Sequence, residues 1–292
     1  MKSIFKQSVW LMGAQTMARV IGFFYTIYLA KILGVESFGL FSVALAYFSF
    51  ISTVAEFGFN RFITREVALD KSKIALLLCN ISIYRLTITA AIIGTLSLVL
   101  YIFDQDKIRV HLTLLAILAT LPLAAAQTID AIFVALRKLQ FSAVGLIAQS
   151  LAVATLGVTL VNSNFGPAGA VTALIFGQVL YLLTLFFILA RQKVKLLSEI
   201  KLSIFKEITI GALPYGILGI LGLIYFRVDT LLLAYLRGNF DTGIYSAAYR
   251  FLEAAILVPT TLSIVLFPIF VNEGKTNKAI TVYVKVLAIV FG

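Results

Sequence analysis

Nine ionisable side chains lie inside long apolar stretches of this 292-residue sequence. An ionisable group in the hydrocarbon core of a bilayer costs at least about 2.5–3.5 kcal/mol, so it is expected to face a partner or a polar cavity. Guanidinium groups suit phosphate, because their donors form a flat bidentate fork and their charge does not titrate away. We therefore expect the arginines to bind an anionic substrate and the carboxylates to tune that field or carry a coupling proton. The nine residues are Arg19, Glu56, Arg85, Asp130, Arg227, Asp229, Arg250, Glu253 and Lys285.

Four of these residues lie at similar depth on two neighbouring spans. Arg227 and Asp229 are on one span, and Arg250 and Glu253 are on the next. At 1.5 Å per residue all four lie roughly 10–15 Å below the same surface. Arg250 and Glu253 are three residues apart and share a helix face. The pattern predicts a mixed-charge cluster in a cavity; the structural alternative is two ion pairs that lock the spans together.

The other charges are distinguished by depth. Arg19 lies near the middle of its span, whereas Arg85 is close enough to the inner face to extend its head group into water. Glu56 and Asp130 lie within one or two turns of the inner end, so an interfacial position is equally compatible with them. The predicted substrate-binding cations are thus Arg19, Arg85, Arg227 and Arg250. The predicted coupling or ion-pair carboxylates are Glu56, Asp130, Asp229 and Glu253.

Composition excludes several other classes of protein. The chain is 61% hydrophobic and 13% charged, which is too little polar surface for a soluble enzyme. Its net charge of +11 indicates basic loops on one side of a membrane rather than nucleic-acid binding. Cys79 and His111 are the single residues of their types, so no disulfide framework or metal site is predicted. Neither a nucleophile–base set nor an ATP-binding loop is recognisable, and we expect neither enzymatic activity nor a cofactor.

Runs of about 20 or more mainly apolar residues, long enough to cross a bilayer, predict eight complete spans. The runs lack the alternation of barrel strands, so an all-α polytopic membrane bundle is predicted. A ninth span begins near residue 279, and the sequence ends within it. The eight spans cover residues 9–33, 38–59, 77–102, 110–136, 141–161, 168–190, 209–236 and 243–270.

Basic residues predict the orientation of these spans. With the N-terminus in the cytoplasm, fifteen of the 24 lysines and arginines fall in inner segments. Only Lys31, Lys107, Arg109 and Arg237 fall in outer loops. This asymmetry predicts a multi-pass protein of the inner (plasma) membrane with a cytoplasmic N-terminus.

The longest polar stretch, residues 191–208, divides the chain into a six-helix lobe (1–190) and an incomplete second lobe (209–292). Leu197, Ile200, Ile204 and Ile208 share one helical face within it. That spacing predicts an amphipathic linker helix on the cytoplasmic leaflet; a solvated loop is the alternative.

An internal repeat supports the two-lobe interpretation. Without gaps, residues 26–44 match residues 230–248 at seven of nineteen positions, including Gly34 with Gly238 and Gly39 with Gly243. The paired glycines flank a tight turn between two helices, where positive φ is needed. Both copies cross in the same direction, and parallel repeats of this kind are typical of transporters.

Two stretches carry a family resemblance. The sequence LAKILGVESFGLFSVALAYFSFISTVAEFGFNRFITRE (29–66) resembles the N-terminal signature of O-antigen-type polysaccharide flippases of the multidrug/oligosaccharidyl-lipid/polysaccharide exporter superfamily. The sequence GNFDTGIYSAAYRFLEA (238–254) resembles the corresponding turn of that family's second lobe. The resemblance implies a MATE-like two-lobe architecture, here with a truncated second lobe.

The resemblance also implies a function. Such proteins move polyprenyl-pyrophosphate-linked oligosaccharides outward for polysaccharide biosynthesis by alternating access. Membrane lipids and other polysaccharide-assembly proteins are the further expected partners. A cation-coupled multidrug exporter and a peptidoglycan-precursor flippase are the alternatives within the superfamily. A membrane-embedded glycan polymerase or transferase would need larger outer loops than this chain has.

Overall fold

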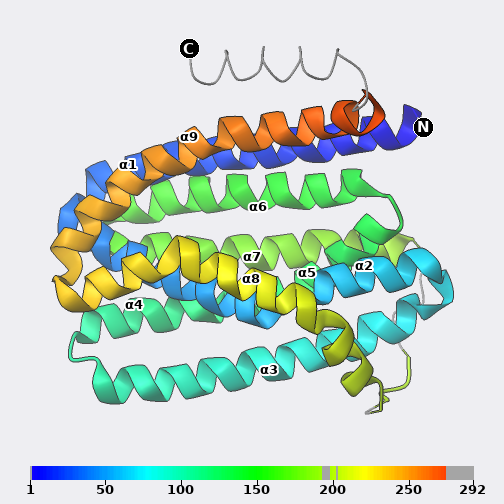
Figure 1. The fold of residues 1–292 in the computed structure, drawn as a ribbon. Helices are drawn as coiled ribbons and strands as arrows, with labels where there is room; N and C mark the ends of the chain where they lie inside the picture. Colours follow the sequence, from blue (N-terminus) through cyan, green and yellow to red (C-terminus); the bar gives the residue numbers. More distant parts are fainter. Residues whose placement is uncertain (1, 193–197, 202, 274–292) are drawn as a thin grey trace. The chain divides into compact units, whose positions relative to one another are not determined.

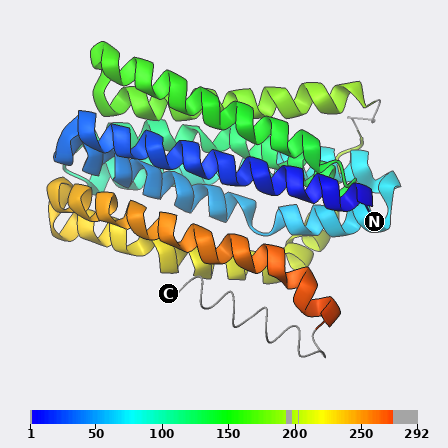
Figure 2. The same cartoon turned by 90° about the horizontal axis from the view of Figure 1, so that it is seen from above.

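The computed structural model describes residues 2–192, 198–201 and 203–273, and these are almost entirely helical. They belong to two compact units, Met1–Ile244 and Tyr245–Gly292. Helices α1 to α8 of the first unit run side by side (Figures 1 and 2). The helices are α1 (Lys2–Glu56), α2 (Phe59–Leu69), a 3-10 turn (Lys71–Lys73), α3 (Ile74–Phe103), α4 (Lys107–Leu118), α5 (Thr120–Ala135), α6 (Leu139–Leu160), a π turn (Val161–Phe165), α7 (Gly166–Arg191), α8 (Ser203–Leu236) and α9 (Gly238–Glu273).

All eight predicted spans coincide with helices. Spans one and two are the halves of α1, which breaks at Gly34 (φ 74°). Span four, predicted as continuous over 110–136, is instead broken between α4 and α5. Pro122 explains the break, because it has no N–H to donate to the Leu118 carbonyl one turn earlier. The predicted ninth span lies outside the described residues.

The turns between helices gather at two opposite ends of the first unit. Those near Gly34, 104–106, 161–166 and Arg237 form one end, which we name the Gly34 end (Figure 1). Those near Gly58, 70–73 and 136–138 form the other, the Gly58 end. Within the described residues, five helical stretches are long and apolar enough to cross a membrane, including Trp10–Leu69, which holds both halves of α1.

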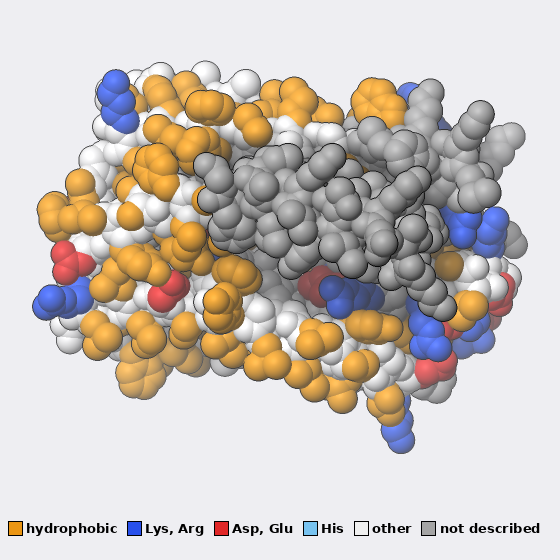
Figure 3. Space-filling view, turned by 45° about the horizontal axis from the view of Figure 1, so that its top comes forward, with side chains coloured by type: hydrophobic (Ala, Val, Ile, Leu, Met, Phe, Trp, Pro, Cys, Tyr) orange, Lys and Arg blue, Asp and Glu red, His pale blue; other side chains and the backbone are white. Residues whose placement is uncertain are grey.

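Apolar side chains cover much of the described surface. In Figure 3, orange side chains predominate over the coloured part of the face, and blue and red ones are fewer. Phe24, Phe187 and Leu218 are each more than half exposed. Such extended apolar exposure suits contact with lipid rather than water, so the architecture is an all-α membrane bundle.

The two copies of the repeat pack against each other reciprocally. Gly238, like Gly34, adopts positive φ (87°). A Cβ atom on Gly39 would lie 1.8 Å from the Asn239 carbonyl oxygen, and one on Gly243 would lie 2.1 Å from the Val35 carbonyl oxygen. Val35 and Asn239 are equivalent positions of the repeat, so the contact has approximate twofold symmetry. The glycines therefore allow close backbone approach as well as the turn itself.

A second close contact joins α8 to the break between α1 and α2. Gly58 has a φ of 79°, and a Cβ atom there would lie 2.5 Å from the Ala212 carbonyl oxygen. A Cβ atom on Gly216 would lie 2.9 Å from the Phe57 carbonyl oxygen, whereas one on Gly222 would face open space. Gly216, two residues after Pro214, therefore allows α8 to pack closely against the end of α1.

The segment before α8 is anchored to α3. The fully buried Asn80 side chain donates to the Glu199 carbonyl (3.0 Å) and accepts from the Lys201 N–H (2.8 Å). Residues 198–201 are not helical, so an amphipathic helix over the whole of 191–208 is not formed. Leu197 lies outside the described residues, and Ile204 and Ile208 belong to the first turns of α8.

Candidate functional site

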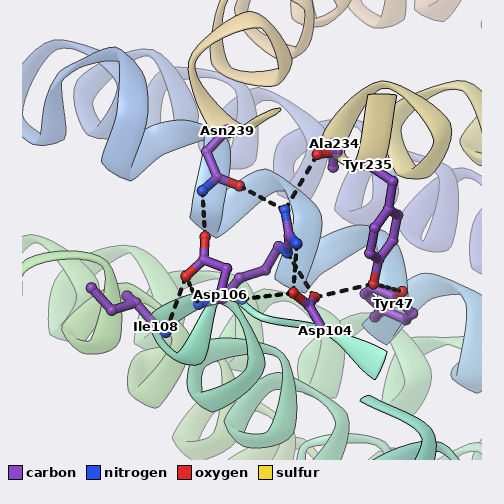
Figure 4. A network of polar contacts seen from close by, with 8 residues as sticks. Tyr47, Asp104, Asp106, Ile108, Ala234, Tyr235 and Asn239 are labelled. Carbon is purple, nitrogen blue, oxygen red and sulfur yellow. Dashed lines mark hydrogen bonds and ion pairs between the residues drawn. The ribbon is translucent and has the colours of Figure 1, made fainter. Parts of the chain in front are cut away.

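A polar network at the Gly34 end joins the loop between α3 and α4 to the turn between α8 and α9 (Figure 4). Two aspartates shape the loop. Asp104 follows the last residue of α3, and its Oδ1 accepts the Asp106 N–H (3.0 Å). Asp106 caps the N-terminus of α4 by accepting from the Ile108 and Arg109 N–H groups (3.1 and 3.0 Å). These local bonds fix the first turn of α4 and therefore the backbone position of Arg109.

Arg109 and Asp104 form the central ion pair of the network. Arg109 donates from Nε to Asp104 Oδ2 (2.8 Å) and from Nη2 to Asp104 Oδ1 (2.6 Å). Their side chains are only 11% and 2% exposed, so water screens the pair weakly. Burial opposes ionisation of Asp104, but the bonds from Arg109 and the Asp106 N–H hold the pKa of this carboxyl below its ordinary value of 3.8.

The same groups reach across to α8 and α9. Arg109 Nη1 donates to the Ala234 carbonyl (3.3 Å) and to Asn239 Oδ1 (3.4 Å), and Asn239 Nδ2 donates to Asp106 Oδ2 (2.7 Å). The Tyr235 hydroxyl donates to Asp104 Oδ2 (3.2 Å), and its ring centroid lies 4.8 Å from the guanidinium carbon. Figure 4 shows Asp104 and Asp106 of the loop before α4 pointing toward Tyr235 of α8 and Asn239 of α9.

A further hydroxyl extends the network into α1. The Tyr47 hydroxyl lies 2.7 Å from that of Tyr235. We name Tyr47, Asp104, Asp106, Arg109, Tyr235 and Asn239 the polar latch. It joins the predicted first lobe to the end of α8 and the start of α9 in the predicted second lobe through polar and ionic bonds. Such bonds can be exchanged for bonds to water at modest net cost.

Sequence reasoning missed this site. Arg109 was assigned only as an outer-loop cation, and the two aspartates and Asn239 were not singled out. The spacing of Asp106 before an apolar helix was a recognisable N-cap signal. The contacts that Arg109 and Asp106 make across the junction join residues 125 to 133 positions apart in the sequence, and no local signal indicates them.

Arg85 forms a second polar network, at the Gly58 end. Its side chain is fully buried, so it does not extend to an aqueous surface. It donates to the Ala55 carbonyl (3.1 Å), Asn60 Oδ1 (3.0 Å) and Gln127 Oε1 (2.7 Å), with a longer bond to Thr128 Oγ1 (3.4 Å). Arg85 of α3 therefore ties together the end of α1, the start of α2 and the middle of α5.

Three other predicted residues of the first unit lie apart from the latch. Glu56 accepts from the Gly58 and Asn60 N–H groups (2.9 and 3.1 Å) and so stabilises the start of α2. Arg19 is exposed on α1, one helical turn from the exposed Gln15. Asp130 of α5 faces Ser142 of α6 and Tyr181 of α7.

The four residues predicted as a mixed-charge cluster divide between the two units. Arg227 and Asp229 lie on α8 in the first unit, where Asp229 Oδ1 accepts from the Thr230 N–H (2.7 Å). Arg250 and Glu253 lie on α9 in the second unit and form an ion pair (2.6 Å). The predicted shared helix face is thus confirmed for Arg250 and Glu253. Lys285 lies outside the described residues.

Known proteins provide independent evidence on the fold and family. A family model described as "Polysaccharide biosynthesis protein" matches residues 4–272. No curated protein matches the chain. Among solved structures, the MATE multidrug transporter DinF-BH, determined in complex with a small compound, superposes with a TM-score of 0.72 at 17% identity, covering 99% of this chain and 70% of its own.

Two further structures show the same fold. An outward-facing multidrug resistance MATE family transporter of the MOP superfamily has a TM-score of 0.60 at 16% identity, over 99% of this chain and 68% of its own. A MOP superfamily transporter from Pyrococcus furiosus has a TM-score of 0.54 at 16% identity, with the same coverage. The chain spans 64% of one of the solved chains that it matches and 73% of another. With the fold of MATE transporters and a family match over residues 4–272, the chain belongs to the polysaccharide biosynthesis protein family.

Proposed function

We propose that this chain moves polyprenyl-pyrophosphate-linked oligosaccharides across the cytoplasmic membrane by alternating access. The observation that carries the proposal is the family match over residues 4–272. Alternating access needs two lobes that separate at one side while closing at the other. We propose that the polar latch is a junction of that kind at the Gly34 end, between the first lobe and the turn from α8 to α9 in the second.

The excess of basic residues in the loops of the Gly58 end supports a cytoplasmic position for that end and for the N-terminus. The latch would then join the first lobe to the turn between α8 and α9 at the outer side. The oligosaccharide head group would enter from the cytoplasm while its lipid tail remained in the bilayer.

The arginines are proposed to neutralise the pyrophosphate during its passage. Arg19 is the leading candidate in the first unit, because its side chain is exposed at mid-span on α1. Arg227 and Arg250 remain proposed substrate cations. Arg85 is fully buried among protein acceptors, so we propose a structural role for it instead.

The full chain in proteoliposomes tests this function. Transport is measured as the appearance of a polyprenyl-pyrophosphate-linked oligosaccharide to a membrane-impermeant lectin on the opposite side. Replacing Arg19, Arg227 or Arg250 by glutamine is expected to slow transport about tenfold or more, because a hydrogen bond to a charged group contributes about 1.5–3 kcal/mol. Arg65→Gln, an exposed position on α2, is the matched control.

The same assay separates the alternatives. A cation-coupled multidrug exporter would move the compound that is bound in the DinF-BH structure and leave the lipid-linked oligosaccharide in place. A peptidoglycan-precursor flippase would move a polyprenyl-pyrophosphate disaccharide-peptide in preference. Full transport by the triple arginine variant would show that these arginines do not carry the substrate.

A cross-link across the latch is expected to stop transport. In a Cys79→Ser background, Asp106→Cys with Asn239→Cys places two thiols where Asn239 Nδ2 and Asp106 Oδ2 now lie 2.7 Å apart. A short bifunctional thiol reagent should join them and reduce transport to the protein-free rate, and a cleavable reagent should allow recovery. Glu66→Cys with Lys73→Cys, at a 2.8 Å ion pair within the first lobe, is the control pair. Undiminished transport by the cross-linked latch would contradict its role as a gate.

A further inference from the structure

Asp130 is an acidic residue inside the bundle with no basic partner in the described chain. It lies on α5, which packs against α6 and α7. The groups that act on its carboxyl are the Ser142 hydroxyl from α6 and the Tyr181 hydroxyl from α7. Arg85 of α3 binds α5 about one turn before Asp130, at Gln127 and Thr128. Asp130 is therefore surrounded by neutral groups.

The close packing of α6 and α7 brings these neutral groups together. A Cβ atom on Gly145, one turn after Ser142, would lie 2.9 Å from the Tyr181 ring, so the ring rests against the first turns of α6. Ser142 is 3% exposed and Tyr181 is 7% exposed. Gln178, 2% exposed, precedes Tyr181 by three residues and so shares its face of α7. The site is closed to bulk water in this conformation.

Several polar atoms of this region are buried without a hydrogen-bond partner among the described residues. They include Asp130 Oδ1, Ser142 Oγ and Gln178 Oε1. Buried polar atoms in native proteins are nearly always bonded, so each such atom indicates a missing partner. The Ser142 and Tyr181 hydroxyl groups can each donate one hydrogen, whereas an ionised Asp130 carboxylate and Gln178 Oε1 only accept, so acceptors outnumber these hydroxyl donors. A proton on the carboxyl supplies a further donor.

Electrostatics also favours a proton bound to the Asp130 carboxyl group. An ionised carboxylate removed from water without a cation costs several kcal/mol, whereas a neutral carboxylic acid buried beside hydroxyl groups costs far less. Tyr181 is the titratable side chain that faces Asp130.

We propose that Asp130, Ser142 and Tyr181 form a proton-binding site within the bundle. The site lies five residues from the end of α5, or about 8 Å from the Gly58 end at 1.5 Å per residue. A small separation of α5 from α6 and α7 would admit water from that end and release the proton. The proton would thereby be coupled to lobe movement, and this coupling rests on the proposed transport function, whereas proton binding itself does not.

Infrared difference spectroscopy of the full chain in lipid nanodiscs tests proton binding. The spectrum of the wild type minus that of Asp130→Asn at neutral pH should contain the C=O stretch of a protonated carboxyl group, which shifts in deuterated water. The matching spectrum for Asp70→Asn, an exposed carboxylate at a loop, should contain ionised-carboxylate bands alone. Tyr181→Phe removes one hydroxyl and should shift the Asp130 band while leaving the fold intact.

Ionised-carboxylate bands in the Asp130 difference spectrum would overturn the site, as would a change of that band with sodium concentration at fixed pH. Coupling is read separately, as the ratio of transport rates with and without an imposed pH gradient. Asp130→Asn should bring this ratio to about one, by loss of its proton-binding group. The wild type could show the protonated-carboxyl band and yet not transport the lipid-linked oligosaccharide. That result would contradict the proposed function and leave the proton-binding site supported.

Discussion

Gly39→Ala should destabilise the protein more than an alanine at any glycine that faces open space. The new Cβ atom would lie 1.8 Å from the Asn239 carbonyl oxygen and 2.8 Å from its carbonyl carbon. Both are backbone atoms, so no side-chain rotation relieves the clash and the two repeat copies must separate. Overpacking of this kind costs about 1–3 kcal/mol and occasionally more. The measurement is the midpoint of thermal unfolding in detergent.

Two further variants make this test specific. Gly243→Ala should have a similar effect, because its Cβ atom would lie 2.1 Å from the Val35 carbonyl oxygen. The double variant should cost less than the sum, since both changes separate the same pair of helices. Gly94→Ala on α3 meets nothing within 4 Å and should be neutral or stabilising by up to about 1 kcal/mol. Equal midpoints for Gly39→Ala and Gly94→Ala would contradict the reciprocal contact.

Arg85→Met is expected to have the second large effect, and on stability rather than on substrate affinity. The change leaves Asn60 Oδ1, Gln127 Oε1 and the Ala55 carbonyl without their donor. Each buried acceptor that loses its partner costs about 1–3 kcal/mol, which is far more than a surface substitution costs. Unfolding midpoints should fall sharply for Arg85→Met and much less for the exposed Arg65→Met.

The Arg85→Lys variant distinguishes a structural role of Arg85 from a substrate-binding role. Arg85→Lys keeps the charge but replaces a flat fork of donors by a point charge, so it should recover only part of the lost stability. A residue that binds substrate would behave differently. Loss of transport by Arg85→Met at an unchanged unfolding midpoint would return Arg85 to the set of cavity cations.

Properties of neighbouring residues account for the parts of the fold that could be predicted. Hydropathy over about 20 residues is enough to define a span, so all eight described spans matched helices. The break at Ala119 could also have been found, because Pro122 cannot donate to the carbonyl one turn before it. Gly34 and Gly238 were assigned to turns from the repeat, and both have positive φ.

The polar latch illustrates what could not be predicted. Asp106 capping α4 is a local event, legible from its spacing to the helix. Which residues of α8 and α9 meet the loop before α4 depends on the axial position of α8 relative to α1 and on the rotation of each helix about its axis. These two quantities select Asn239 and Tyr235 as partners. A shift of one residue would turn a helix by about 100° and point either side chain elsewhere. Arg85 is similar, since depth alone allowed both a surface position and the buried one it occupies.

By itself the sequence determined the membrane class, the positions of the described spans, the charge asymmetry of the loops and the turns of the repeat. These follow from the cost of burying polar groups in hydrocarbon and from the φ angles open to glycine. The tertiary structure alone decided which groups surround each charge: Asp104 pairs with Arg109, Arg85 binds neutral acceptors with the Glu56 charge nearby, and hydroxyl groups face Asp130. Those pairings depend on helix register and rotation, which are set by packing over the whole bundle rather than by any local pattern.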